Sequence, residues 1–393
     1  MDSIELLNII SQGETSKVQF KLLLDNKDSI AAEMIAMANS KGGVILFGVE
    51  DKTGAIAGLD YIQLQKIENE VATIATDFIK PQIFVNTEVV PLGDEKKNIL
   101  IVHVDEGVSK PYKDRNGTIW IKQGSDKRKL TDNNEQIRLF QQSGLVYVDE
   151  IVVPNTSLND IDNSKVEKYL KKLDQKELDI PLLSLCQNLN IIRNDKITLG
   201  GLLFFSDNPQ LYRPAFSIKA VAYYGNDFEG VDYRDSIDIV GTLPEMFDEA
   251  LSFLKRNLHY RQNAQSFNST GELEIAEIAL EELVQNALTH RDYSINAPIN
   301  LLIFDNRVEI ISPGSLPNNL TIENIKMGNA VVRNNLIVSF SSRMMEYRGL
   351  GSGIRRALKY QPNIQLVDDK ESNKFKVTIP RQTPYAGAND NRS

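Results

Sequence analysis

The chain has 393 residues and a net charge of −9, with 41% hydrophobic and 25% charged residues, which is the composition of an ordinary globular protein with two or three domains. Its single cysteine, Cys186, excludes an internal disulfide and a cysteine-based zinc site, and its three histidines argue against a His-rich metal centre. No apolar run reaches the roughly 18 residues that cross a membrane, and residues 1–5 lack the features of a signal peptide, so a cytoplasmic protein with no membrane partner is expected.

Residues 1–145 alternate between helical and strand-like patterns, which predicts an α/β domain. Some stretches repeat apolar residues at helical spacing, whereas others are short apolar runs bounded by glycine turns. The expected elements are a helix over 3–10, a helix over 29–39, a strand over 44–49 after the Gly42-Gly43 turn, a strand around Trp120 and a helix over 133–142.

Three motifs in this region resemble the Schlafen/Alba-type domain. They lie at residues 14–21 (Glu-x-x-x-x-Gln-Phe-Lys), 36–43 (Ala-x-Ala-Asn-Ser-x-Gly-Gly) and 47–51 (Phe-Gly-Val-x-Asp). The resemblance implies a domain that contacts nucleic acid. Some domains of this type also cleave RNA, using two glutamates and an aspartate around a divalent metal.

The acidic positions of that nuclease pattern are only partly kept. Glu14 stands at the first position and Asp51 (or Glu50) at the third, but the second is Gln19. An amide keeps an oxygen ligand and removes a negative charge, which weakens Mg²⁺ or Mn²⁺ binding. A metal-dependent endoribonuclease that uses Glu14 and Asp51 is therefore an alternative. The plainer interpretation is that Glu14 pairs or caps at the entrance to a strand.

A basic cluster lies between residues 110 and 129. Seven basic and two acidic residues give it a local charge of +5, with Tyr112 and Trp120 interleaved. Such a cluster suits phosphate contacts and base stacking, although composition alone favours a solvated hairpin with a core tryptophan. Together with the Schlafen resemblance, it predicts DNA or RNA contacts from Lys21, Lys110, Lys113, Lys127, Arg128 and Lys129.

Residues 146–270 show no chemistry and are expected to form a linker and a connecting α/β region. The patterns predict helices over 164–173 and 244–258, and buried strands over 197–205 and 216–224. No internal repeat and no coiled-coil heptad is present in the chain.

A helix over 274–288 places Glu282 and Asn286 on one face, one turn apart. A carboxylate and an amide so placed suit two linked tasks, orienting a water against a phosphate and giving Mg²⁺ an oxygen ligand. Ile275 and Ala279 lie in line with them and suit a flat base. Further on, Arg-Gly-Leu-Gly-Ser-Gly at 348–353 predicts a glycine-rich turn that opens a helix and binds phosphate through its backbone N–H groups.

The order of these two motifs resembles the GHKL ATPases, the class of gyrase and the histidine kinases, and in particular a divergent branch once grouped as AAA-4. The resemblance implies an α/β sandwich that binds ATP and Mg²⁺. The usual adenine-reading Asp is replaced by Ser312, after a hairpin over 299–311, and a hydroxyl bonds more weakly than a carboxylate. The implied roles are Glu282 or Glu281 for the attacking water, Asn286 for the metal, and Asn286, His290, Ser312, Gly314, Arg348, Gly349, Gly351 and Gly353 for the cofactor.

We therefore predict an α/β (α+β) protein with a Schlafen/Alba-type domain over 1–145, a connecting region over 146–270, a GHKL-like sandwich over 271–380 and a disordered tail over 381–393. ATP would order residues 341–352 over the nucleotide and switch the N-terminal domain, in a homodimer. The resemblance implies a transcriptional-regulatory or antiviral-defence role with weak ATPase activity, and no G-x-x-x-x-G-K-[ST] loop is present. Besides the endoribonuclease, a catalytically silent scaffold stays open, favoured if the 312–317 loop fills the pocket.

Overall fold

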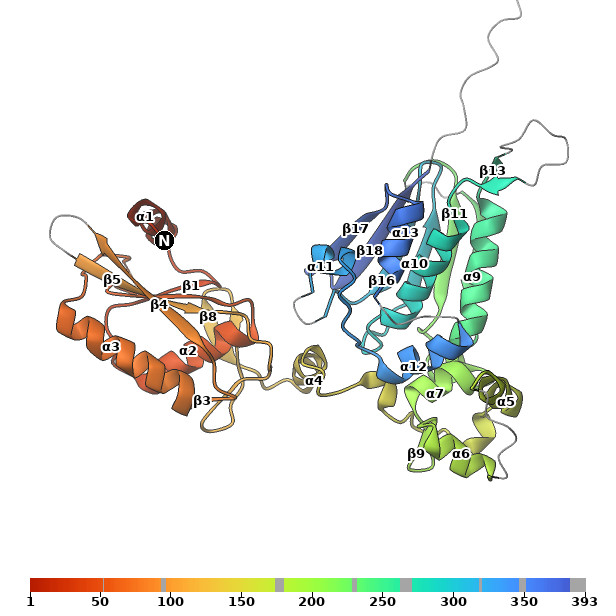
Figure 1. Cartoon of the computed structure of the whole chain (residues 1–393), viewed down its shortest axis with the longest axis horizontal. Helices are drawn as coiled ribbons and strands as arrows, with labels where there is room; N and C mark the ends of the chain where they lie inside the picture. Colours follow the sequence, from red (N-terminus) through yellow and green to blue (C-terminus); the bar gives the residue numbers. More distant parts are fainter. Residues whose placement is uncertain are drawn as a thin grey trace, which may run out of the picture. The chain divides into compact units, whose positions relative to one another are not determined.

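The computed structural model describes residues 1–51, 53–92, 97–173, 180–227, 232–261, 271–317, 320–345 and 351–381. The chain divides into two compact units, Met1–Val146 and Tyr147–Ser393, both of mixed α/β type (Figure 1). Within the described residues, no helix is both long and apolar enough to cross a membrane.

The first unit is built on a four-stranded sheet of order β1-β2-β5-β4, in which β1 and β2 are parallel and the other pairs antiparallel. Its elements are α1 (Ser3–Gln12), β1 (Val18–Lys21), α2 (Lys27–Asn39), β2 (Gly43–Phe47), α3 (Tyr61–Thr73) with a π-helical turn (Ile74–Phe78), β3 (Ile79–Lys80), β4 (Val85–Leu92), β5 (Lys97–Val104), β6 (Lys113–Asp114), β7 (Trp120–Gln123), β8 (Asp126–Lys129) and α4 (Asn133–Gln142).

Both faces of this sheet are buried, because its central strands carry apolar residues at successive positions. On β2, Ile45 and Phe47 pack with α2 and α3, whereas Leu46 packs on the opposite face with Leu6 of α1. The helix α2 is buried along its whole length from Ile30 to Asn39, and that run includes a carboxylate. The N-terminal motifs therefore lie on the rigid centre of the unit.

The second unit has a six-stranded sheet of order β12-β11-β15-β16-β18-β17, parallel only between β11 and β15. Its elements are two 3-10 turns (Val148–Glu150 and Leu158–Asp160), α5 (Asn163–Lys172), α6 (Leu182–Asn188), β9 (Ile192–Arg193), β10 (Lys196–Ile197), α7 (Leu199–Phe205), α8 (Pro209–Tyr212), β11 (Ile218–Tyr223), β12 (Tyr233–Ile239), α9 (Leu243–Asn257), β13 (Tyr260–Arg261), β14 (Glu272–Leu273), α10 (Glu277–His290), β15 (Ile299–Ile303), β16 (Arg307–Pro313), α11 (Ile322–Lys326), α12 (Asn335–Met344), α13 (Gly353–Tyr360), β17 (Gln365–Asp369) and β18 (Lys374–Pro380).

Three helices, α9, α10 and α13, cover one face of the six-stranded sheet (Figure 1). Burial alternates along β11, where Ile218, Ala220 and Ala222 face the helices and the residues between them are more exposed. Such alternation is typical of a sheet with one covered face, so the unit is a two-layer α/β sandwich. The predicted helices over 274–288 and 354–360 and the hairpin over 299–311 are confirmed.

The predicted strand over 197–205 is wrong. Only Lys196–Ile197 is extended, and Leu199–Phe205 is the buried helix α7, which begins where the Thr198 hydroxyl accepts a hydrogen bond from the Gly201 N–H at 3.1 Å. All seven residues of α7 are buried, so the run is apolar on every side. A short, uniformly apolar run has no period to separate helix from strand.

The segment over 146–270, expected to be a linker and connecting region, supplies β11 and β12 to the six-stranded sheet and α9 to the helical layer. At the other end, Arg381 was expected in a disordered tail. It is buried, and its guanidinium lies 2.8 Å from the Glu274 carboxylate. Residues 382–393 of the expected tail lie outside the described residues.

Candidate functional site

The helix α10 carries the two residues on which the site depends, Glu282 and Asn286. It has no side-chain cap at its start, and its C-terminal carbonyls are held by neighbouring side chains. The Tyr293 hydroxyl donates to the Leu288 carbonyl at 2.7 Å, and the buried Asn334 amide donates to the carbonyls of Thr289 and Arg291, both at 2.9 Å. These contacts satisfy the orphan acceptors of the last turn and fix α10 in position.

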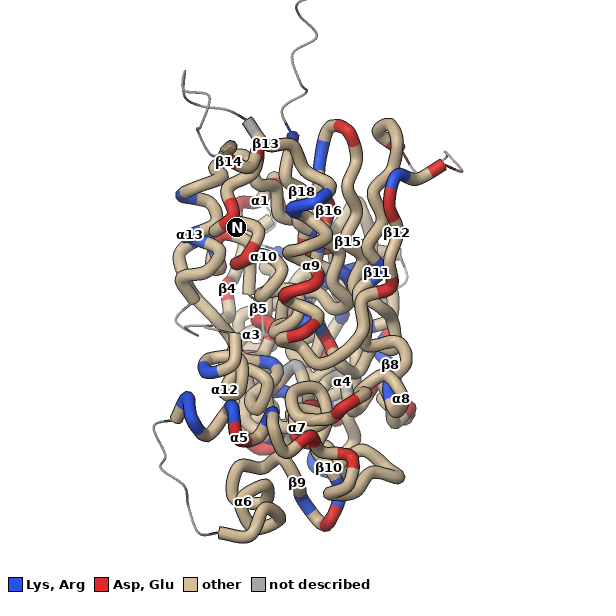
Figure 2. The backbone as a smooth tube through the Cα atoms, turned by 90° about the vertical axis from the view of Figure 1, so that its right-hand side faces the viewer, with Lys and Arg blue, Asp and Glu red and all other residues tan. Residues whose placement is uncertain are grey.

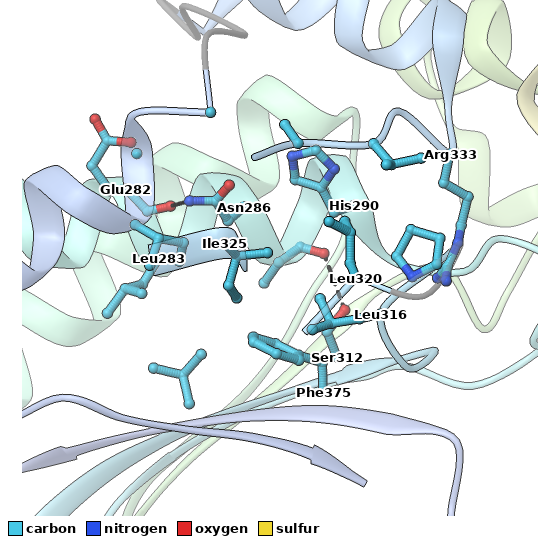
Figure 3. A pocket seen from close by; sticks show the side chains of 18 of the residues that line it. Glu282, Leu283, Asn286, His290, Ser312, Leu316, Leu320, Ile325, Arg333 and Phe375 are labelled. Carbon is cyan, nitrogen blue, oxygen red and sulfur yellow. Dashed lines mark hydrogen bonds between the residues drawn. The ribbon is translucent and has the colours of Figure 1, made fainter. Parts of the chain in front are cut away.

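A pocket lies between α10, the ends of β16 and β18, and the start of α13. Its empty volume, which includes space open to solvent, is about 1060 Å³. Figure 3 shows Glu282 and Asn286 at one end, Arg333 at the other, and apolar side chains between them. The apolar lining includes Leu283, Ala287, Ile310, Leu316, Leu320, Ile325, Phe375 and Val377.

The start of α13 is pressed against the acidic end of this pocket. A Cβ atom on Gly353 would lie 2.5 Å from a Glu282 carboxylate oxygen and 3.1 Å from the Asn286 amide nitrogen, so the glycine lets the backbone approach both side chains where they stand. Arg356, one turn later, places its guanidinium 2.9 Å from the buried Glu282 carboxylate. The Asn286 amide donates to the Glu282 carbonyl at 2.6 Å, which leaves its own carbonyl oxygen as an acceptor.

The loop after β16 forms the opposite wall. The buried Ser312 hydroxyl donates to the Ala287 carbonyl at 3.2 Å, so the hydroxyl oxygen keeps only acceptor capacity toward a ligand. Gly314 has φ +101°, a conformation that side chains rarely adopt, and its Cβ would lie 2.5 Å from both Asp292 and Arg333. The 312–317 loop thus borders the pocket and does not fill it.

His290 lies at the end of α10 in the same pocket, close to the positive charge of Arg333. Burial and that charge lower the pKa of the His290 imidazole to about 4, so the ring is neutral at neutral pH. The Arg333 guanidinium donates to the Ser315 carbonyl at 2.5 Å and lies 4.0 Å from the Asp292 carboxylate. This end of the pocket therefore offers a neutral imidazole beside a buried cation.

The lowered pKa of His290 predicts a pH-dependent stability. Between the unfolded value of 6.5 and the folded value of about 4, the unfolded chain binds the extra proton. Above pH 6.5, protonation of His290 therefore has no effect on the free energy of unfolding. As the pH drops toward 4, protonation of His290 in the unfolded chain lowers that free energy by up to about 3 kcal/mol. Denaturant unfolding of His290→Gln should show a flatter pH profile than wild type. The control His259→Gln, at an exposed histidine, should keep the wild-type profile; an unchanged profile in His290→Gln would contradict the burial argument.

Several expected contributors lie elsewhere. Ile275 and Ala279, expected to contact a base, are fully buried in the core and do not line the pocket. Glu281, on the neighbouring position of α10, does not line it either. Ser341 is buried within α12, so the expected closing segment begins as a helix. Arg348 and Gly349 lie outside the described residues, whereas Gly351 and Gly353 line the pocket.

The residues that follow His290 stabilise the fold. Arg291 is 2% exposed and donates to the carbonyls of Ile295 and Ala297, and its guanidinium lies 4.7 Å from the Phe216 ring centre. Neither Arg291 nor Tyr293 lines the pocket. Of the His-Arg-Asp-Tyr stretch, only His290 belongs to the site.

In the first unit, Glu14 and Asp51 have separate partners. One Glu14 carboxylate oxygen accepts hydrogen bonds from the Phe20 N–H at 2.8 Å and from the Gln19 side-chain amide, and Asp51 forms an ion pair with Lys21. Over the described ranges, no group of three or more His, Cys, Asp or Glu residues is arranged to hold a metal.

Four of the six expected phosphate contacts form ion pairs within the unit. Lys110 is itself buried, and Lys127 pairs with the buried Glu33. Lys21 pairs with Asp51 and also donates to the Phe20 carbonyl, so these three lysines are held by the fold. The half-exposed pair of Arg128 contributes only about 0–1 kcal/mol and leaves that residue able to meet a phosphate. The pairs are Lys110–Glu106 at 2.7 Å, Lys127–Glu33 at 3.0 Å, Arg128–Glu135 at 2.7 Å and Lys21–Asp51.

Lys113 and Lys129 lie on either side of the segment Ile119–Trp120. Lys113 forms an antiparallel β-bridge with Ile119, and Lys129 on β8 is the strand partner of Trp120 on β7. The Lys129 ammonium lies 5.5 Å from the Trp120 ring centre. Tyr112, expected to stack on a base, is buried, whereas Trp120 is half-buried. Figure 2 shows that acidic and basic residues are interspersed along the backbone.

Sequence reasoning missed Arg356 and Arg333 in the pocket, and Glu33 and Lys122 in the first unit. Arg356 follows Gly353 by one helical turn, so its spacing offered a signal. The Glu33–Lys122 ion pair, at 2.6 Å, joins residues 89 positions apart, and no local pattern reports such a pair.

Three sequence families match parts of the chain. Residues 14–131 match the Schlafen AlbA_2 family, residues 296–379 a family described as putative ATP-dependent DNA helicase recG C-terminal, and residues 138–218 a domain of unknown function, DUF8451. The recG-type match begins after α10, so Glu282 and Asn286 lie outside it. The first two matches relate the chain to nucleotide- and nucleic-acid-associated domains.

Among solved structures, the chain is similar to the DIP2311 protein from Corynebacterium diphtheriae, at 19% identity and a TM-score of 0.48, over 97% of this chain and 80% of that one. No curated protein matches the sequence.

Proposed function

We propose that this chain, which joins a Schlafen AlbA_2 domain to an ATPase-like domain of the recG C-terminal type, binds ATP with Mg²⁺ in the second unit and nucleic acid in the first, as a regulatory or defence protein. The observation that carries the proposal is the pocket, which has an acid–amide pair and a glycine-opened helix at one end and an apolar lining beyond them. This is the distribution of groups that a nucleotide requires, with charge at the phosphates and apolar surface at the base.

The phosphates would lie at the start of α13. The N–H groups of its first turn and the helix dipole favour an anion there, and Gly353 lets the backbone approach closely. Arg356 adds a guanidinium on the same turn, suited to bidentate phosphate contacts. Gly351 and Ser352, directly before α13, line the same pocket.

The base would lie over the apolar lining, near Ser312. Because the Ser312 hydroxyl donates to Ala287, its oxygen accepts from a ligand, which fits the amino group of adenine. Phe375 and Ile310 offer apolar surface beside it. A serine stands here in place of a carboxylate. Selection of the base would therefore be weaker than with the charge-assisted hydrogen bond that a carboxylate forms.

Asn286 would hold Mg²⁺. Its amide nitrogen is fixed by the Glu282 carbonyl, so its carbonyl oxygen is oriented as a ligand, and Mg²⁺ commonly binds through one or two protein oxygens plus phosphates. When bound, the ion would neutralise phosphate charge. Glu282 would then orient water, at a low rate while Arg356 holds its carboxylate.

Nucleic acid would contact the first unit at Lys113, Arg128 and Lys129 around Trp120. Affinity should fall steeply with salt, and Lys113→Glu with Lys129→Glu should lower the slope of log K against log salt by roughly 0.7 to 0.9 per lost phosphate contact. Fluorescence anisotropy with labelled DNA and RNA across a salt series measures this. Lys168→Glu, an exposed lysine of the second unit, is the control. Equal slopes in the double variant and wild type would place the contacts elsewhere.

Nucleotide and nucleic acid would be coupled through the helix α12. The buried Asp149 carboxylate, just after the first unit ends, accepts from the Ile337 N–H at 2.9 Å and so caps α12, which leads toward the glycine-rich loop. A change at that loop would therefore reach the segment that joins the units.

Coupling of this kind is reciprocal. ATP with Mg²⁺ should change nucleic-acid affinity, and nucleic acid should change ATP affinity by the same factor, typically about 5- to 150-fold. Paired titrations of the full chain measure both factors. Unchanged affinities in both directions would leave two independent sites and would contradict a switch of the first unit by nucleotide.

A further inference from the structure

A chain of hydrogen-bonded polar side chains, buried at its centre, starts at the acidic corner of the first unit, which is formed by Glu14 and the start of β1. It runs from Glu14 to Gln19 on β1, to Lys122 on β7, to Glu33 on α2 and to Lys127 on β8. Glu33 is 2% exposed, and the Lys122 side chain is 2% exposed. Charges so deeply buried are stable only when paired and fully hydrogen-bonded.

The Lys122 ammonium lies in a cage of three oxygens. It donates to the Glu33 carboxylate at 2.6 Å, to the Ser125 carbonyl at 2.6 Å and to the Gln19 side-chain carbonyl at 3.1 Å. An ammonium group has three donors and no acceptor, so all of its hydrogen-bonding capacity is used. A carboxylate, a backbone carbonyl and an amide carbonyl are also the oxygens that bind hard cations such as Ca²⁺ in proteins.

We propose that the Lys122 ammonium is the resident cation of this corner, filling an oxygen cage that would otherwise take a metal or another small cation. Lys122 is thus a positioning residue. It holds the carbonyl oxygen of Gln19, so the amide nitrogen of Gln19 is turned toward Glu14 and donates to it. The Glu14 carboxylate is thereby stabilised by side chains of the protein itself.

This assignment is independent of the ATP proposal and explains the amide at position 19. A glutamate there would place a second carboxylate beside Glu14, where Gln19 now supplies a hydrogen-bond donor. We therefore expect the first unit to fold without a divalent ion. Gln19→Glu would lose that donor and should create a weak Mn²⁺ site.

The test is chemical rescue of Lys122→Ala in the full chain. Trp120 is the single tryptophan and lies on β7 with Lys122, so its fluorescence reports unfolding of the first unit. The unfolding midpoint of Lys122→Ala should drop, and ammonium should restore it in a saturable manner. Tetramethylammonium, too large for the cage, should not restore it at equal ionic strength. Lys66→Ala, at an exposed lysine on α3 of the same unit, should show no difference between the two ions.

Equal responses of Lys122→Ala to the two ions would overturn the proposal. Lys122→Met, which keeps the apolar stem, replaces Lys122→Ala if that variant does not fold. A second measurement compares wild type with Glu33→Gln, which removes the carboxylate of the cage: Mn²⁺ titration followed by electron paramagnetic resonance should give the same binding in both proteins. Mn²⁺ bound by wild type and lost in Glu33→Gln would show a metal where we place the ammonium.

Discussion

Replacing Asn286 with alanine should weaken ATP–Mg²⁺ binding by about 10- to 100-fold, the usual loss when a metal ligand or its supporting partner is removed. The variant loses the carbonyl oxygen assigned to the ion and the 2.6 Å hydrogen bond to the Glu282 carbonyl. Isothermal titration of the full chain with ATP, with and without Mg²⁺, measures both effects. Without Mg²⁺ the difference between wild type and variant should shrink, because the metal contact is then absent.

The matched control is Asn363→Ala, at an exposed asparagine that does not line the pocket. It should bind ATP as wild type does. Equal affinity in Asn286→Ala and wild type, with Mg²⁺ present, would remove Asn286 from the site and with it the acid–amide pair as the metal end of the pocket.

Replacing Glu282 with glutamine should leave ATP bound but slow its hydrolysis by about 10²-fold or more, because an amide does not take a proton from the attacking water. Glutamine keeps the size of the side chain and an oxygen toward Arg356, so the start of α13 should keep its position. Phosphate release under single-turnover conditions, with excess enzyme, separates the chemical step from product release.

Glu281→Gln tests the neighbouring carboxylate, which does not line the pocket, and should hydrolyse ATP normally. Loss of hydrolysis in Glu281→Gln with normal rates in Glu282→Gln would reverse the assignment. Arg356→Lys is a further comparison. A lysine lacks the planar guanidinium fork, so it should hold the Glu282 carboxylate less firmly and raise the hydrolysis rate if the ion pair restrains Glu282.

Local spacing was sufficient for the parts of the site that lie on single elements. Glu282 and Asn286 share a face because α10 is regular over that turn, and Gly353 opens α13 as expected. Helical spacing placed Ile275 on the same face as Glu282, but α10 begins only at Glu277, so Ile275 is not on the helix. Ala279 is on the helix but is fully buried in the core. Spacing assigns a face to a residue, and tertiary packing decides what covers that face.

The basic cluster shows the same limit more strongly. A count of charges gave +5 between residues 110 and 129. Lys127 pairs with Glu33, 94 residues away, and Lys122 is buried against the same carboxylate. Among the ion pairs described for this cluster, only Lys110–Glu106 joins residues four positions apart, a separation short enough to be recognised in the sequence. Net charge over a segment therefore overestimates the cations available to a ligand.

Hydrogen–deuterium exchange of the full chain, with and without ATP–Mg²⁺, reports both whether the nucleotide binds and where it binds. We expect slower exchange in peptides from α10, from residues 312–317 and from the start of α13, and less protection of the same peptides in Asn286→Ala at the same ATP concentration. No change in these peptides at millimolar ATP, or protection confined to residues 1–146, would contradict the assignment of the nucleotide to this pocket.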